Sequence, residues 1–425
     1  MLAARPCPSS RASVARLLIA VFLTLAWANI VVAQERDRSP ALTEAAVVGR
    51  ALQRAPLIDV LEGAVAVEEG RGRAASAYPN PQLLYMREQT FGTFGTGEDY
   101  LSVAQTIDLG NRRGMYGEAG EMRARAAERE GDATRLGVAA DARHRFYEVL
   151  YRQLRVSALE GWAAHVDQSL SIVARREQRG DVAMYDRRRF EREQGVARGR
   201  LAVEEAALER AQARLHAILG EARSPVSVTG TLLPETDPAS LQALRSSSTA
   251  RPDFLALDLQ IEAASLNRRA ASRWWAPDLR VEGGWKGIDL GAGNRTDGFL
   301  LGASLSIPLW DQSSGLARVA EGELRAARGR RALLESEVDG ELGGARADAV
   351  RLRHAAAELR QRTSSASADL VRMTTLGYEA GELGVLELLD AYRGVADDEL
   401  TALDVEQAAR RARIELDRLT GARVQ

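Results

Sequence analysis

The sequence predicts a mainly α-helical protein with a small β portion, built from two similar halves. Alternating, strand-like segments occur twice, and each time a long stretch rich in alanine, arginine, glutamate and leucine follows without proline. Proline and glycine recur at matching places: Pro81 and Pro277 are 196 residues apart, and Gly180 and Gly381 are 201 apart. Self-similarity over such a distance indicates a duplicated structural unit.

A secretory signal is predicted over residues 1–33. Three arginines precede the apolar run LLIAVFLTLAWA, residues 17–28, and small residues suited to cleavage follow. The mature chain is therefore expected to begin near Gln34. The one cysteine, Cys7, would leave with the signal, so we expect no disulfide, no thiol-bound metal and no lipidated cysteine. No later segment approaches the roughly 20 apolar residues of a membrane-spanning helix.

Two β-hairpins are predicted, over residues 82–109 and 278–310. In the second, apolar side chains alternate with glycine and serine, the pattern of a strand with one apolar and one polar face. The apolar positions are Phe299, Leu301, Ala303, Leu305, Ile307 and Leu309. The first hairpin alternates less regularly, because Gln105 interrupts its apolar side. Turn-forming segments, FGTFGTGED and GAGNRTDG, separate the strands of each pair.

A helical hairpin is expected after each strand pair, over residues 110–220 and 312–421. Apolar residues three to five positions apart form helical stripes, and leucines seven apart indicate antiparallel coiled coils. Short helices are expected before each strand pair. The chain would thus consist of the signal, a first structural repeat over residues 34–220, a linker over residues 221–240 and a second repeat over residues 241–425.

Four strands cannot close a barrel by themselves, because small barrels need about eight. An open sheet in lipid would leave the polar groups of its edges unpaired. Copies of the chain are therefore expected to share a transmembrane barrel: three copies give twelve strands, and their long helices continue it as an α-helical tunnel. Gly110 and Asn111 would let the chain pass from barrel to tunnel. A formal net charge of −2 argues against a nucleic-acid binder that depends on positive charge.

No catalytic constellation is recognisable. The histidines His144, His165, His216 and His354 fall in helical stretches, and none lies at metal-ligand spacing from another histidine or a cysteine. The sequence contains neither a nucleophile elbow nor a phosphate-binding loop. We therefore expect no enzymatic activity, no cofactor and no metal site.

The order of the segments resembles the TolC-like outer-membrane efflux proteins over essentially the whole mature chain. A signal, short helices and a strand pair ending in QTIDLGNRR precede a long helix, an RGD turn and a return helix ending in LHAILG. The second half repeats this order with SIPLWD, YEAGELGVLELLDAYR and IELDRLTG. YPNPQL followed by QTIDLGNRR is most similar to the branch that serves resistance-nodulation-division pumps for heavy-metal cations.

The resemblance implies a homotrimer in the outer membrane whose helical tunnel extends into the periplasm. It implies a periplasmic adaptor protein and an inner-membrane resistance-nodulation-division pump as partners, outer-membrane lipid around the barrel, and no nucleic acid. The channel would be the exit duct for divalent heavy-metal cations. Two alternatives remain open: the exit duct of a multidrug efflux or type I secretion system, and an exported coiled-coil scaffold or adhesin without a pore.

The resemblance also implies a gate at the periplasmic tip, in GVLELLDAYR. Leu386, Asp390 and Arg393 are spaced i, i+4 and i+7, so they share one helical face. In a trimer Asp390 would form a ring of three carboxylates that favours cations and bonds to Arg393. The alternative is an exposed i, i+3 pair of Asp390 and Arg393 without a gating role.

The turns of the helical hairpins are expected to dock the adaptor. The residues concerned are Gly180 and Asp181 in the first repeat and Gly381 and Glu382 in the second. An ordinary helical-hairpin turn uses the same residue types, so this assignment depends on the resemblance.

Overall fold

The structure is a computed structural model that describes residues 41–92, 95–220, 226–291, 293–307, 309–310 and 313–422. The predicted signal peptide and the first five residues of the predicted linker, 221–225, lie outside the described residues.

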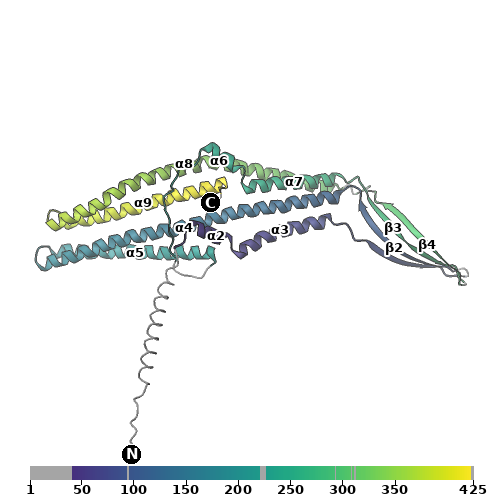
Figure 1. Cartoon of the computed structure of the whole chain (residues 1–425), viewed down its shortest axis with the longest axis horizontal. Coiled ribbons are helices and arrows are strands. Elements are labelled where there is room, and N and C mark those ends of the chain that lie inside the picture. The colour runs from purple at the N-terminus through teal and green to yellow at the C-terminus, as the bar shows by residue number, and fades with distance from the viewer. Residues whose placement is uncertain are drawn as a thin grey trace, which may run out of the picture. The chain divides into compact units, whose positions relative to one another are not determined.

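Two similar series of helices and strands make up the described chain (Figure 1). The first series is α2 (Glu44–Leu52), α3 (Ala55–Ser76), β1 (Gln82–Gln89), β2 (Gly97–Asp108), α4 (Arg112–Gln178) and α5 (Met184–Leu219). The second is α6 (Leu241–Ser248), α7 (Pro252–Ser272), β3 (Asp278–Asp289), β4 (Arg295–Leu305), α8 (Ser314–Ala380) and α9 (Val385–Thr420). The predicted fold class, long helices with four strands, is confirmed.

The duplication is visible in the lengths of the helices. α4 and α8 have 67 residues each, and α5 and α9 have 36 each. Each of the two longest helices begins directly after a residue with positive φ, Asn111 (49°) and Ser313 (52°). The halves differ in how the strand joins the helix, since residues 109–111 separate β2 from α4 and residues 306–313 separate β4 from α8.

The described chain divides into two compact units. One contains the turns of both helical hairpins and includes residues 145–232 and 366–403. The other contains the sheet, α3, α6 and α7 with the adjoining parts of α4, α8 and α9. We call them the tip unit and the sheet unit.

In the tip unit, the end of α4, α5, the end of α8 and the start of α9 share one apolar core. Its members recur every three or four residues along each helix, so each helix presents one stripe to the core. They are Leu159, Trp162, Val166, Val173, Phe190, Ala197, Tyr378, Val385, Leu388, Leu389, Tyr392 and Ala396. Each fully buried large side chain contributes about 1.5–3 kcal/mol, and this packing stabilises helices whose surfaces are otherwise charged.

In the sheet unit, all four strands form one antiparallel sheet in the order β1-β2-β3-β4. The middle pair joins the two repeats, from Gly97 opposite Asp289 to Asp108 opposite Asp278. β4 ends at Leu305. The apolar alternation continues past that residue in the sequence without forming further strand.

The first helices of the sheet unit pack through glycine. A Cβ added to Gly120 of α4 would lie 2.3 Å from Cα of Gly72 on α3, so the two backbones touch. Only residues without a side chain permit such an approach. Among the described residues, none of the helices combines the length and the apolar composition that a bilayer-spanning helix requires.

Candidate functional site

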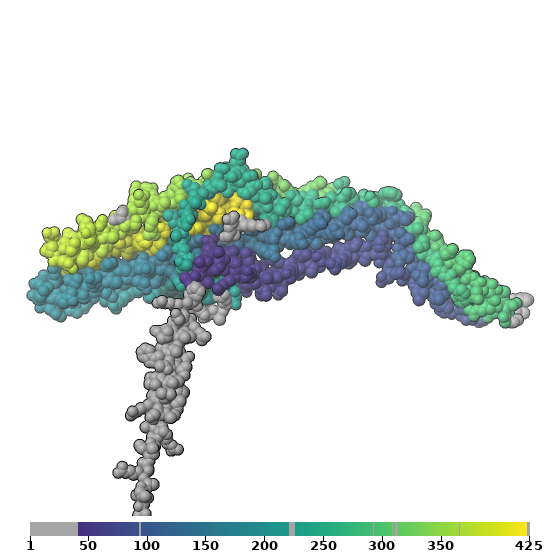
Figure 2. All heavy atoms as spheres, viewed as in Figure 1, coloured from purple at the N-terminus to yellow at the C-terminus, as the bar shows by residue number. Residues whose placement is uncertain are grey.

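One face of the sheet is apolar and exposed. The register places Tyr85, Leu101, Trp285 and Phe299 in one row across the four strands, and all odd-numbered residues of the strands share their side. Phe299 is 82% exposed. The other large apolar side chains exposed on this face are Leu83, Val103, Ile107, Leu301 and Leu305. No helix covers the face of the sheet seen in Figure 2. A continuous exposed apolar surface indicates contact with lipid or with another chain.

The opposite face of the sheet is mostly polar and is better covered on β2, although Leu84 and Met86 of β1 are exposed on it. On β2, Ser102 and Ala104 of this face are 2% and 3% exposed. The hydroxyl of Ser102 donates a hydrogen bond to Oε1 of Glu282 on β3 at 2.5 Å. Nζ of Lys286 lies 2.8 Å from Oε2 of Glu98. The more exposed face of the sheet is therefore the apolar one, the reverse of a sheet in water-soluble proteins.

Both edges of the sheet are free in the single chain. Among the residues that the structure describes, β1 pairs only with β2, and β4 only with β3. Every residue of β1 is exposed, as are nearly all residues of β4. A free edge presents unpaired backbone N–H and C=O groups, which are costly in lipid and readily pair with another strand.

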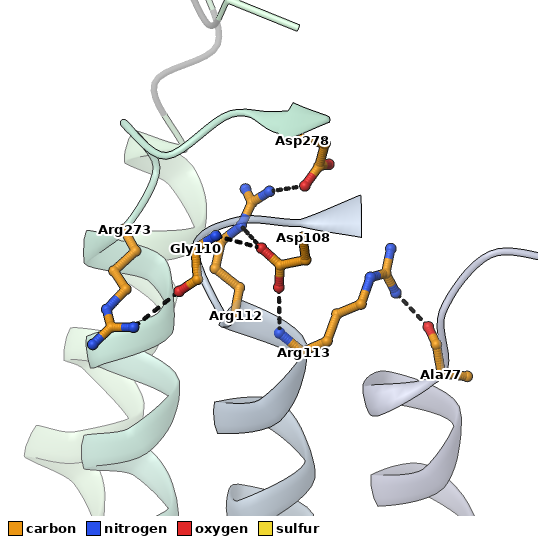
Figure 3. A network of polar contacts seen from close by, with 7 residues as sticks. All are labelled: Ala77, Asp108, Gly110, Arg112, Arg113, Arg273 and Asp278. Carbon is orange, nitrogen blue, oxygen red and sulfur yellow. Dashed lines mark hydrogen bonds and ion pairs between the residues drawn. The ribbon is translucent and has the colours of Figure 1, made fainter. Parts of the chain in front are cut away.

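A polar network holds the chain where β2 meets α4 (Figure 3). Asp108 accepts hydrogen bonds from the backbone N–H of Gly110 at 3.0 Å and of Arg113 at 2.8 Å. The second bond satisfies an N–H in the first turn of α4 that has no partner within the helix. Arg112 lies between two strands, with Nη2 2.6 Å from Oδ1 of Asp278 and Nε 3.5 Å from Asp108. The helix start is thus fixed to β2 and β3.

Gly110 and Asn111 occupy the turn at which the sequence placed them. Arg273, just after α7, donates to the carbonyl of Gly110 at 2.9 Å. A Cβ on Gly110 would lie 3.0 Å from the Cβ of Ala276, so the position favours glycine. The network joins residues 108–113 to Arg273 and Asp278, more than 160 positions away, and no pattern in the sequence pointed to these two contacts.

The predicted gate residues share one exposed face of α9. Leu386 is 55% exposed, and Asp390 and Arg393 are exposed as well. In the described chain Arg393 bonds to Glu193 of α5, with Nη2 and Nε donating to the two carboxylate oxygens at 2.5 and 3.2 Å. These bonds raise the pKa of Arg393, and Asp390 adds to that rise only through its charge. The exposed pair of Asp390 and Arg393, left open as an alternative, is not formed in the single chain.

Glu193 is the site residue that the sequence analysis missed. Its side chain is 5% exposed. It lies three residues after Phe190 and four before Ala197, both fully buried, and an acidic residue within an apolar stripe was the available signal. A second ion pair between α5 and α9 follows, with Nη1 of Arg200 2.8 Å from Oδ1 of Asp397.

The turns at the tips have the same backbone geometry in both repeats. Gly180 and Gly381 are left-handed, with φ of 79° and 80°. The N–H groups of Asp181 and Glu382 each donate to the carbonyl five residues earlier, at 3.0 and 2.9 Å. This is the Schellman motif, in which glycine avoids the strain of a side chain. All four residues are exposed.

Arg176 ties the two hairpins together near these turns. From the last turns of α4 it donates to the carbonyls of Tyr378 and Glu379 at the end of α8, at 3.1 and 2.7 Å. Its guanidinium lies 5.1 Å from the centre of the Tyr378 ring. The last carbonyls of α8, which have no partner within the helix, are thereby satisfied.

The described residues contain no group of three or more histidine, cysteine, aspartate or glutamate side chains arranged to hold a metal ion. His165 stacks on Tyr392 with 5.3 Å between ring centres, and Nε2 of His354 lies 3.1 Å from Asp237. Each of these histidines has an ordinary packing or surface contact.

Known proteins are similar to this chain in sequence and in fold. Residues 243–422 match the family described as outer membrane efflux protein. The cobalt-zinc-cadmium resistance protein CzcC of Cupriavidus metallidurans is 27% identical over 383 residues, which are 83% of this chain and 84% of that protein. The structure of CusC covers 89% of this chain and 91% of its own, with a TM-score of 0.70 and 17% identity. The second half of the chain thus matches the outer membrane efflux protein family, and the likeness to CzcC and CusC extends over both halves.

Two further structures share the fold of this chain. The outer membrane protein VceC of Vibrio cholerae has a TM-score of 0.70 at 15% identity, over 89% of this chain and 96% of its own. The open state of the MtrE outer membrane channel of Neisseria gonorrhoeae has a TM-score of 0.69 at 19% identity, over 88% of both chains. Both are outer-membrane proteins, and the likeness shows that this chain has their fold.

Proposed function

We propose that this chain is the exit duct of a tripartite system that exports divalent heavy-metal cations, and that it works as a homotrimer. The observation that carries the proposal is the four-stranded sheet, which has an apolar exposed face, a polar inner face and two free edges. Such a sheet is complete only when another copy pairs with each edge.

Three copies close the sheet into a barrel of twelve strands, four from each chain. β1 of one copy pairs with β4 of the next, which satisfies the backbone groups of both edges. The row of Tyr85, Leu101, Trp285 and Phe299 then faces outer-membrane lipid, and the polar face lines the lumen. The long helices of the three copies continue the lumen into the periplasm, where they meet an adaptor protein and, through it, an inner-membrane resistance-nodulation-division pump.

Divalent metals are the proposed cargo because of the similarity to CzcC, whose name describes resistance to cobalt, zinc and cadmium. The multidrug and secretion alternatives share the same channel fold, so the cargo is decided by an assay of transport. A pore-free scaffold is disfavoured, because it gives no reason for an exposed apolar face on a sheet with a polar interior.

Growth of a deletion strain tests the cargo. The strain is grown with and without the restored gene on gradients of zinc, cobalt, cadmium, nickel, copper and silver, beside several hydrophobic drugs. We expect restored tolerance to metals alone. Tolerance restored only to drugs would keep the channel and refute the metal assignment, and a soluble periplasmic rod in place of detergent-resistant trimers would refute the channel.

The gate is proposed to be the α9 face that carries Leu386, Asp390 and Arg393. Its closed position is supported by the bond of Arg393 to Glu193 and by the neighbouring pair of Arg200 and Asp397, since both join the return helices α5 and α9. Opening would require these contacts to part when the adaptor engages the tips.

The exposed turns, Gly180 with Asp181 and Gly381 with Glu382, are proposed to receive the adaptor. Gly381→Leu adds bulk at the tip without a clash, since a Cβ there meets no atom within 4 Å, although the left-handed φ adds local strain. We expect pump-dependent resistance to be lost while trimers persist. Gly161→Leu, on α4 and equally free of neighbours, is the matched control. Retained resistance in the Gly381 variant would remove this glycine from the docking surface.

A further inference from the structure

On the polar face of β3, two opposite charges lack an ionic partner among the described residues. They are Glu282 and Arg280, two positions apart on β3. Oε1 of Glu282 accepts a hydrogen bond from the hydroxyl of Ser102 at 2.5 Å. Nη1 of Arg280 donates to Oε1 of Gln82 at 2.7 Å. Each charge is therefore held by a neutral side chain from another strand, and the two are not bonded to each other.

The other charged residues on this face of β2 and β3 each have an ionic partner. Lys286 lies 2.8 Å from Glu98, and its ammonium is 4.9 Å from the centre of the Tyr100 ring. At the opposite end of the strands, Arg112 bridges the carboxylates of Asp108 and Asp278. Between these two clusters, Glu282 and Arg280 are the charges that remain uncompensated on the polar face of β3.

The surroundings of Glu282 leave its carboxylate open to the lumen. The residue opposite it on β4 is Gly302, and Gly284 follows it on the same face of β3. Neither glycine can cover the carboxylate. Arg280 has Thr106 and Ser304 as its register partners, which are short and uncharged.

We propose that Glu282 and Arg280 form two stacked rings of opposite charge in the barrel lumen, and that these rings set the ion selectivity of the channel. This inference rests on the trimer of the proposed function, in which each residue occurs three times around the pore axis. Two residues of a strand span roughly 7 Å, so a passing ion meets the carboxylates and the guanidinium groups in succession. The two rings have opposite effects on ion selectivity, so removing the charge of one leaves the other to determine it.

The expected changes have opposite signs. Glu282→Gln keeps the shape and the hydrogen bond to Ser102 but removes three negative charges, so the ratio of cation to anion permeability should fall. Arg280→Gln should raise it. Three charges about 10 Å from the axis of a barrel of this size, screened over one Debye length, change the local concentration of each ion about twofold in opposite directions, and therefore the ratio about fourfold.

Reversal potentials of purified trimers in planar bilayers, under a gradient of dilute KCl, measure this ratio. Asp297→Asn is the matched control, because Asp297 carries the same charge on the outward face of β4 and is 63% exposed in its side chain. We expect wild-type selectivity from the control, opposite shifts from the two lumen variants, and smaller shifts at high salt.

Unmoved reversal potentials, or shifts of the same sign in both variants, would overturn the two-ring inference while leaving the channel itself standing. Wild-type protein that forms no conducting trimers would overturn the channel and the rings together. The variants are compared only as assembled trimers. If Glu282→Gln does not assemble, the shift in Arg280→Gln, read against the control, decides.

Discussion

Replacing Glu193 by glutamine should loosen the hold of α5 on α9 at the tip of the helical hairpins. The carboxylate is 5% exposed and accepts two hydrogen bonds from Arg393, whose side chain is 45% exposed. Hydrogen bonds to a charged group contribute about 1.5–3 kcal/mol and neutral ones about 0.5–1.5. Removing the charge while keeping the shape should therefore cost about 1.4 kcal/mol, a factor of about ten in an equilibrium constant.

Single-channel recording on purified trimers measures this change. If the bond holds the gate closed, the odds of the open state should rise about tenfold in Glu193→Gln. The conductance of the fully open state should stay the same, because Leu386 and Asp390 on the exposed gate face are unaltered. Glu205→Gln, an exposed carboxylate on the same helix, is the matched control and should behave as wild type.

A second substitution tests whether the bond between Glu193 and Arg393, and not another contact of Arg393, keeps the channel closed. With Glu193→Gln already present, Arg393→Gln should add little to the odds of opening, because both changes remove the same interaction. Equal odds of opening in Glu193→Gln and in Glu205→Gln would refute the reasoning. If Asp390→Asn alone opens the channel, the contact that keeps it closed is the ring of Asp390 carboxylates implied by the resemblance.

Three further predictions concern stability. Gly120→Ala should lower the unfolding temperature of detergent-solubilised trimers, with a cost of about 1–3 kcal/mol per chain, because its Cβ would lie 2.3 Å from Cα of Gly72. Gly137→Ala is the control and should be neutral or stabilising, because a Cβ at this position of the same helix would meet no atom within 4 Å. Equal losses of stability in the two variants would contradict the close approach of the backbones. Asp108→Ala should cost about 1–2 kcal/mol by removing the cap of α4, measured by denaturant unfolding, and an unchanged midpoint would show that the network is dispensable. Burial, followed by the charge of Arg411, lowers the pKa of His144 below its ordinary 6.5. The unfolded chain therefore binds the proton more strongly than the folded chain, and stability should fall as the pH drops below 6.5. His144→Gln should flatten this part of the pH profile of the unfolding temperature.

The tips show how far a local pattern reaches. The glycines of the two turns were found in the sequence, because a left-handed residue at a helix end depends only on its immediate neighbours. The side chain that binds Arg393 was not found, since Glu193 is 200 residues away and its partner depends on how α5 packs against α9. For the same reason the sequence suggested Asp390, three residues away, as the partner of Arg393.

The strand-to-helix junction gives the same lesson. Gly110 was recognisable as a turn residue, but the contacts of Asp108, Arg112 and Arg273 join segments as much as 166 residues apart. Likewise, the alternation around Leu305 predicted a strand that continues to residue 310, whereas β4 ends at Leu305. Pairing depends on a partner strand, and the alternation of side chains does not specify where the partner ends.

The sequence by itself determined the duplicated halves, the long helices, the four strands and the apolar face of the sheet. Each of these depends on periodicity within a single segment: a period near 3.6 for helices and of two for strands. Only the tertiary structure decided which charges are paired. Glu98 and Lys286 neutralise each other, whereas Glu282 and Arg280, on the same face, are held apart by Ser102 and Gln82. Such pairing depends on the register between strands distant in the chain, which the periodicity of each strand does not fix.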